Sequence, residues 1–249
     1  FLIVVMVLLA LITSMAGLTS GLLFIFPLII SIILLMGYNK QTAALTTIGS
    51  VAVGLIGTTV SATNINAIVG LLSLDFSSEL LTKAIILIVG LVLLIFNVLT
   101  YAKKNKLSKE ERKEQVAELP TSKDSKKKTW PIIVIVDLIL IIMIVASLSW
   151  DTVFGIKLFN DVHEAVMKFE VGKFAIFGKI LGESSAVAFG KWTLTELTLL
   201  VTIGAGLVSL FYKKSFNDFI KNFFEGVKKA FTPAVLIFLA YIVLVITAT

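Results

Sequence analysis

Residues 57–66 read Gly57-Thr58-Thr59-Val60-Ser61-Ala62-Thr63-Asn64-Ile65-Asn66, and this stretch decides how the rest of the chain is interpreted. Its hydroxyl side chains, β-branched residues and two asparagines all disfavour a continuous helix. No formal charge occurs anywhere between Lys40 and Asp75. A segment too polar for a regular helix and too uncharged for water predicts a re-entrant hairpin or a broken helix, which we place within residues 41–74.

The break predicts a binding site. Backbone released from helical hydrogen bonds is tolerated at membrane depth only where protein or water covers it, and secondary transporters build substrate sites from such breaks. Asparagine amides both donate and accept hydrogen bonds, which suits a carboxylate or a zwitterionic amino acid. The candidate substrate-binding residues are Thr58, Thr59, Ser61, Thr63, Asn64 and Asn66. The alternative is a helix rich in small residues that packs tightly on its neighbours.

Long apolar blocks around this stretch predict an all-α membrane protein, a multi-spanning helix bundle. Only 15% of the residues are charged, whereas a soluble domain is usually about a quarter charged. A hydrocarbon core about 30 Å thick requires roughly 20 apolar residues in a helix. The blocks expected to be helical are 1–16, 18–36, 79–101, 131–150, 192–212 and the segment opened by Pro233. The glycine-containing break between the first two predicts a tight turn or a kink.

The charged residues divide the chain into three parts. Residues 1–101 form a first set of membrane helices, which includes the re-entrant or broken segment. Residues 102–129 form a strongly basic linker that is expected to be helical at 107–118. Residues 130–249 form a second set of membrane helices. Because the chain starts and stops within apolar runs, we expect a fragment of a longer protein.

The second set of helices contains two amphipathic regions. Residues 151–191 mix aromatic and charged side chains, which predicts an interfacial helix or an ordered loop outside the membrane. Residues 213–231 alternate phenylalanines and lysines at helical spacing, which predicts a helix lying in the interface before Pro233 opens the last span. Since positive residues favour the cytoplasm, the linker and residues 213–231 are placed inside and residues 151–191 outside.

Composition excludes several function classes. The chain has no cysteine and a single histidine, His163, so no metal site and no cofactor is expected. No catalytic sequence motif is present, and no cluster of His, Asp or Glu lies inside the predicted spans, so the chain is not expected to be an enzyme. The lysines of the linker are not interleaved with aromatic residues. The net charge of +6 therefore reflects the positive-inside bias and not nucleic-acid binding.

Several short segments make the chain similar to a known family. They are Met36-Gly37-Tyr38-Asn39-Lys40, Ser61–Asn66, Ile68-Val69-Gly70-Leu71, Tyr101-Ala102-Lys103-Lys104, Gly190-Lys191-Trp192, Phe219-Ile220, Phe224-Glu225-Gly226 and Ala234-Val235-Leu236-Ile237. The chain resembles the YfcC-like family of basic amino-acid (arginine/ornithine-type) antiporters of the ion-transporter superfamily. The resemblance implies inverted repeats, alternating access and gradient-driven exchange of amino acids, with the family's tip on residues 61–66.

The main hypothesis is a multi-pass secondary transporter, a permease or antiporter, in the inner or plasma membrane of a bacterial cell. It would move amino acids, with arginine/ornithine exchange as the reaction that the resemblance implies. Its partners would be a small-molecule substrate and the lipid bilayer, with a homodimer left open. The alternatives are a non-transporting structural or assembly subunit, and an ion-coupled carrier of dicarboxylates or peptides. A cationic substrate would also require acidic site residues, and the chain offers few.

Overall fold

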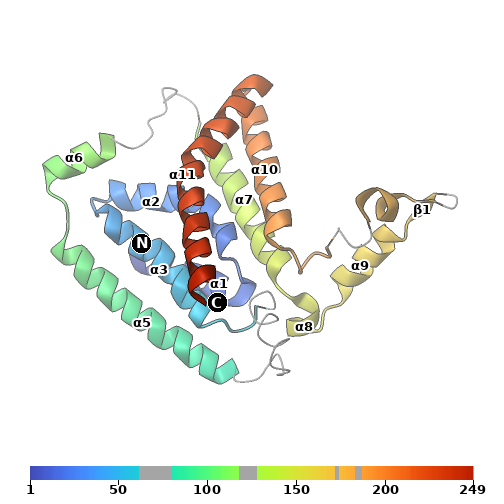
Figure 1. The fold of residues 1–249 in the computed structure, drawn as a ribbon, viewed down its shortest axis with the longest axis horizontal. Coiled ribbons are helices and arrows are strands. Elements are labelled where there is room, and N and C mark those ends of the chain that lie inside the picture. Colours follow the sequence, from blue (N-terminus) through green and yellow to red (C-terminus); the bar gives the residue numbers. More distant parts are fainter. Residues whose placement is uncertain (62–79, 118–127, 172–173, 183–186, 249) are drawn as a thin grey trace.

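A computed structural model describes residues 1–61, 80–117, 128–171, 174–182 and 187–248, and these ranges are helical almost throughout (Figure 1). The elements are α1 (Leu2–Ala16), η1 (Ser20–Phe24), α2 (Phe26–Leu35), α3 (Lys40–Ile56), α5 (Leu80–Lys104), α6 (Lys109–Ala117), α7 (Trp130–Ser147), α8 (Trp150–Phe154), α9 (Leu158–Met167), β1 (Glu170–Val171), β2 (Phe174–Ala175), η2 (Gly178–Gly182), α10 (Leu194–Phe211) and α11 (Phe216–Ala248). Among the described residues, the four helices α5, α7, α10 and α11 are long and apolar enough to cross a membrane. The predicted all-α membrane fold is confirmed.

The break after α1 is a tight turn and not a kink. Gly17 adopts a left-handed conformation with φ 72°, and its amide donates to the Thr13 carbonyl at 3.0 Å. This is a common way to end a helix. Helices α1 and α2 contain 15 and 10 residues, which gives lengths of about 22 and 15 Å. Neither reaches across a hydrocarbon core of about 30 Å without additional chain.

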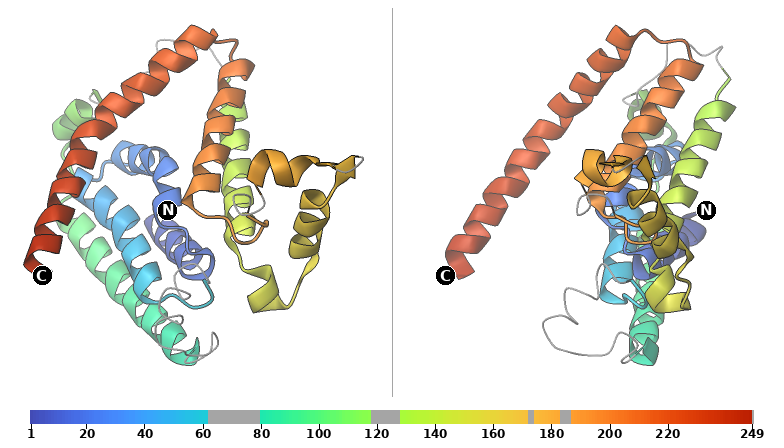
Figure 2. Two further views of the ribbon diagram at one scale, coloured as in Figure 1. Left: turned by 45° about the vertical axis from the view of Figure 1, so that its right-hand side comes forward. Right: turned by 90° about the vertical axis from the view of Figure 1, so that its right-hand side faces the viewer.

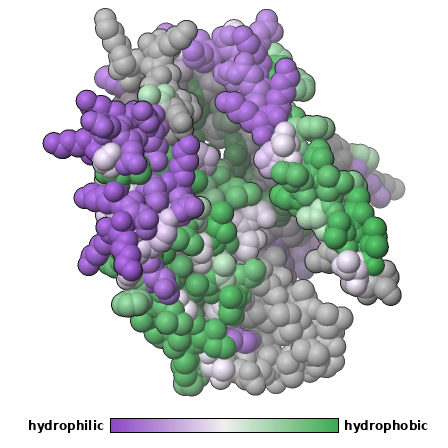
Figure 3. Space-filling view, turned by 60° about the vertical axis from the view of Figure 1, so that its left-hand side comes forward, coloured by the Kyte–Doolittle hydropathy of each residue, from purple (hydrophilic) through white to green (hydrophobic). Residues whose placement is uncertain are grey.

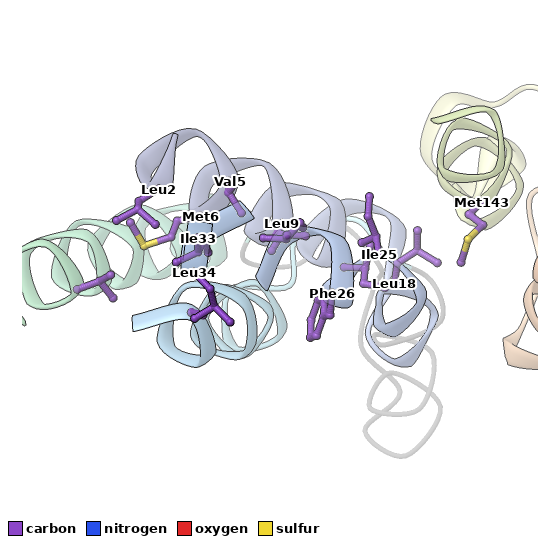
Figure 4. Packing of buried hydrophobic residues seen from close by; sticks show 14 of the residues in the cluster. Leu2, Val5, Met6, Leu9, Leu18, Ile25, Phe26, Ile33, Leu34 and Met143 are labelled. Atoms are coloured by element: carbon purple, nitrogen blue, oxygen red, sulfur yellow. The ribbon is translucent and has the colours of Figure 1, made fainter. Parts of the chain in front are cut away.

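A hydrophobic core joins α1, η1 and α2 to the second half of the chain. Met6 of α1 and Ile33 of α2 are fully buried and lie close together in Figure 4. Met143 of α7, also fully buried, points toward Leu18 and Ile25 in the same view. The first three helical elements therefore act as a packed platform for their neighbours.

Helices α3 and α5 pack antiparallel. At one end, the Tyr101 hydroxyl of α5 donates to the Gln41 side-chain oxygen of α3. At the other end, a Cβ added to Gly57 would lie 2.7 Å from the Cα of Leu87. Glycine at position 57 therefore lets the end of α3 touch the backbone of α5, as small residues do where membrane helices meet.

The hydroxyl residues of α3 serve packing. Thr46 and Thr47 are fully buried, and their hydroxyls donate to the carbonyls of Thr42 and Ala43 at 2.8 and 2.9 Å. Ser50, also buried, donates to the Thr46 carbonyl at 2.6 Å. Because these hydroxyls are satisfied within their own helix, they can face a neighbouring helix without an unpaired polar group. Residues 42–50 therefore fit the alternative interpretation of this segment, a helix rich in small residues that packs tightly on its neighbours.

The two ends of the bundle differ in charge. The basic end comprises Lys103, Lys104, α6 and the corner at residues 212–215 between α10 and α11 (Figure 1). Figure 3 shows hydrophilic surface gathered in its upper part and hydrophobic surface below. The tip end is the opposite one, where α1 and α3 finish beside each other at Ser14 and Gly57. The orientation of these ends relative to the cell stays a prediction.

The helix predicted in the basic linker is confirmed as α6, which docks on the end of α2. The Arg112 guanidinium donates to the Leu35 carbonyl, and the Gln115 side-chain nitrogen donates to the Tyr38 carbonyl at 3.0 Å. A cation is favourable at this position because the C-terminal end of a helix carries a partial negative charge. Part of the linker is therefore attached to the bundle.

The described residues between 151 and 191 form a small projection at the side of the bundle, which contains α8, α9, the β1–β2 pair and η2 (Figure 2). The Lys191 ammonium lies 2.7 Å from the Asp151 carboxylate. The Asn160 side chain also donates to that carboxylate, at 2.9 Å. These contacts hold the beginning and the end of the projection together. Its predicted position outside the membrane remains a prediction.

The C-terminal segment differs from the sequence prediction. We expected an interfacial helix to end before Pro233 and a new helix to begin there, but α11 is one helix of 33 residues with Pro233 in its interior. A proline removes one backbone donor and disturbs one turn, and the helical hydrogen bonds on both sides carry the helix through. Figure 2 shows α11 diverging from the bundle after its corner with α10. Whether its first half lies in the interface stays a prediction.

Candidate functional site

The described part of the predicted site lies at the end of α3. The helix stops at Ile56, and the chain from Thr58 to Ser61 is not helical. The Thr58 hydroxyl donates to the Leu55 carbonyl at 2.7 Å, which satisfies one of the carbonyls left open at a helix end. The helix therefore ends several residues before the predicted break at residues 61–66, at Gly57, which also approaches the backbone of α5.

Ser14 attaches this turn to α1. Its hydroxyl donates to the Gly57 carbonyl at 2.7 Å and lies 3.0 Å from the Thr59 hydroxyl. The Thr59 amide donates to the Ser14 carbonyl at 3.2 Å. Ser14 is fully buried. Sequence reasoning missed Ser14 because it sits in an apolar helix with no polar pattern, and only its contact with a distant turn reveals its role.

Removal of this hydroxyl is the first testable change. The Ser14→Ala variant is expected to lose about 1–3 kcal/mol of stability, because the Gly57 carbonyl and the Thr59 hydroxyl lose a buried partner. The measurement is the melting temperature of the purified protein in detergent. Ser31→Ala is the matched control, since the Ser31 hydroxyl bonds only to Pro27 within α2 in an exposed setting. Equal melting temperatures for the two variants would show that the Ser14 hydroxyl does not stabilise the turn after α3.

Of the six predicted site residues, the structure brings three together. Thr58, Thr59 and Ser61 lie in the turn after α3, and Ser61 is only 1% exposed. Thr63, Asn64 and Asn66 lie outside the described residues. The turn offers hydroxyls and backbone groups without a charged side chain. Across the described ranges, no group of three or more His, Cys, Asp or Glu residues could hold a metal ion.

Lys83 of α5 lies one helical turn from the contact of this helix with Gly57. Leu87 packs against Gly57, and Lys83 lies four residues earlier, on the same face of the helix. One helical turn rises about 5.4 Å, so the flexible side chain of a lysine there can extend to the turn after α3. Lys83 is half-buried. The sequence alone did not single it out, because a lysine near the end of a span can simply extend to the interface.

A small pocket of about 120 Å³ lies at the same end, between the turn after α1, the end of α7 and the start of α10. Thr19, Ser20 and Ser147 line it together with Thr193. Ser147 is 3% exposed, and its hydroxyl has no hydrogen-bond partner among the residues that the structure describes.

A comparison with protein families matches residues 1–248 to the family described as DcuC, C4-dicarboxylate anaerobic carrier. Comparisons with curated proteins and with solved structures find no match. The family match confirms a multi-pass membrane transporter and not an enzyme. It overturns the resemblance to the YfcC-like antiporters and, with it, amino-acid transport and arginine/ornithine exchange as the function. That resemblance was carried by short scattered segments, whereas the family match covers nearly the whole chain and supports the dicarboxylate alternative.

Proposed function

The chain belongs to the DcuC family of C4-dicarboxylate anaerobic carriers, and from this premise we propose that it works in a secondary transporter that moves four-carbon dicarboxylates across the membrane. The family match over residues 1–248 is the observation that carries the proposal. The charge pattern around the tip supports it. No acidic residue lies between Lys40 and Asp75, and carboxylates there would repel a dianion. The lack of acidic residues in this stretch also argues against a basic amino acid as substrate, because a cation would require acidic partners.

The turn after α3 supplies the donors in this proposal. A carboxylate accepts hydrogen bonds and makes its strongest ones with several aligned or charged donors. The groups proposed to contact the substrate belong to Thr58, Thr59, Ser61, Thr63, Asn64 and Asn66, and the Thr58 hydroxyl would have to leave the Leu55 carbonyl in order to donate to a carboxylate. Ser14 fixes the backbone at Thr59, which holds the neighbouring donors of the turn in place and reduces the freedom that they lose when substrate binds.

Lys83 is proposed to bind the same substrate through its charge. An ionisable residue within a span is costly, and it usually pairs or faces a substrate path. Its place on α5, one turn from the Leu87 contact with Gly57, supports this role. A charged donor beside neutral hydroxyls would attract a dicarboxylate and discriminate against a zwitterion or a cation.

The proposal is tested by uptake of labelled succinate into proteoliposomes that contain the full-length protein. Excess unlabelled fumarate is expected to reduce uptake at least tenfold, because it presents the same pair of carboxylates. Butyrate, arginine and ornithine are expected to leave uptake unchanged. Competition by arginine as strong as that by fumarate would contradict the proposal. A folded protein that transports none of these compounds and co-purifies with a fixed partner would favour the structural-subunit alternative. A homodimer stays a prediction.

A further inference from the structure

A large cavity at the basic end is separate from the tip. It has a volume of about 650 Å³ and lies between the first turn of α7, the last half of α10 and the first turns of α11. Figure 2 shows α10 and α11 meeting at their corner and diverging from there. The tip residues Ser14, Gly57 and Lys83 do not line it. The proposed transport function therefore does not account for the cavity.

The cavity combines an apolar wall with a cationic mouth. Ile132, Val208 and Phe223 contribute to the wall, one from each helix, and Lys128 and Lys214 lie at the mouth. None of the described residues that line it is acidic. An amphiphile with an anionic head and apolar chains matches both parts, whereas a small dianion would leave the apolar wall without a partner.

Two hydrogen bonds connect the chain around Lys128 and Lys214. The Tyr212 hydroxyl donates to the Lys128 carbonyl, which ties the start of α7 to the end of α10. Lys213 has φ 51°, and the Lys214 amide bonds back to the Ser209 carbonyl at 2.9 Å. Glycine is usual at such a left-handed position after a helix. The corner between α10 and α11 therefore has a strained backbone at Lys213.

Aromatic side chains place the mouth at the level of lipid headgroups. The rings of Trp130 and Phe211 meet edge to face, with centroids 6.0 Å apart, beside Tyr212. Tryptophan and tyrosine are enriched where the hydrocarbon meets the headgroups. With the aromatic residues at that boundary, the apolar wall would extend into the hydrocarbon region, and the two lysines would lie at the level of the phosphates.

We propose that this cavity binds one anionic phospholipid, with its phosphate between Lys128 and Lys214 and its acyl chains along the wall formed by α7, α10 and α11. Basic pockets between membrane helices are suited to such headgroups. The bound lipid would fill the space between α10 and α11. The proposal is independent of the transported substrate.

The test compares retention of phosphatidylglycerol and phosphatidylcholine by the full-length protein, measured by native mass spectrometry from detergent. The parent protein is expected to retain one phosphatidylglycerol at least tenfold more tightly than the Lys128→Gln/Lys214→Gln double variant. Lys103→Gln/Lys104→Gln is the matched control, since it removes two charges from the same end outside the cavity. Ala205→Trp keeps both lysines but places a bulky ring in the apolar part of the cavity, and it is also expected to retain the lipid less tightly.

Several outcomes would overturn the proposal. Equal retention of phosphatidylcholine would show that the phosphate charge is not recognised. Full retention by the Ala205→Trp variant would assign binding to the charged surface and not to the cavity. Displacement of the lipid by inorganic phosphate at equal concentration would assign the lysines to free phosphate. Displacement by succinate would assign the cavity to the transported substrate.

Discussion

The Lys83→Met variant is expected to raise the concentration of C4-dicarboxylate needed for half-maximal uptake by about 10- to 150-fold. Methionine keeps the length and the apolar stem of the side chain and removes the charge. A hydrogen bond to a charged group contributes about 1.5–3 kcal/mol, and each 1.4 kcal/mol corresponds to about a tenfold change in affinity. The measurement is the concentration dependence of labelled succinate uptake into proteoliposomes.

Two further variants separate the role of Lys83 from general effects of charge. Lys83→Arg keeps a cation at this position and is expected to retain most of the affinity. Lys103→Met removes the same charge from the other end of α5, at the basic end, and is expected to behave like the parent protein. A correctly folded Lys83→Met protein with unchanged uptake would remove Lys83 from the proposed site and leave the hydroxyl turn to be tested by itself.

The Gly54→Ala variant is expected to destabilise the contact between α1 and α3 by about 1–3 kcal/mol or more. A Cβ at position 54 would lie 2.5 Å from the carbonyl oxygen of Ala10 and 2.8 Å from the Cβ of Thr13. The atom at 2.5 Å belongs to a helix backbone, so a rotamer change cannot relieve the overlap and α1 must move. The melting temperature in detergent and the yield of monodisperse protein measure the effect.

A glycine in open space provides the control for this change. Gly206 of α10 has no atom within 4 Å of an added Cβ. Gly206→Ala is therefore expected to be neutral or stabilising by up to about 1 kcal/mol, because alanine favours a helix more than glycine does. If both variants melt at the temperature of the parent protein, the close approach of α1 and α3 is not a determinant of stability.

The sequence predicted two helices of the first half well. The long and largely apolar run at 79–101 predicted α5, and the charged stretch at 107–118 predicted α6. Such patterns depend on neighbours within a few turns, so local reasoning suffices. Pro233 shows the limit. Proline at the start of an apolar run usually marks a helix start, but the helical bonds on both sides keep α11 continuous there.

The candidate site was predicted only in outline. Hydroxyl residues and asparagines indicated a broken helix, and the described turn at Thr58–Ser61 is non-helical. The substrate class was not predictable in the same way, because neutral donors bind an amino-acid carboxylate and a dicarboxylate alike. The scarcity of acidic residues around the turn was the one signal in the sequence that pointed to an anion. The match of residues 1–248 to the dicarboxylate family corrected the assignment.

By itself, the sequence determined that this chain belongs in a membrane and which of its segments are apolar enough to enter it. Both depend on apolar length relative to a hydrocarbon core about 30 Å thick, which is a local property of the chain. Only the tertiary structure decided the surroundings of the tip. Ser14 and Thr59 are 45 residues apart yet bonded, and Leu87 packs against Gly57 with Lys83 one turn away. Such pairings follow from the register in which whole helices pack, which no short stretch of sequence encodes.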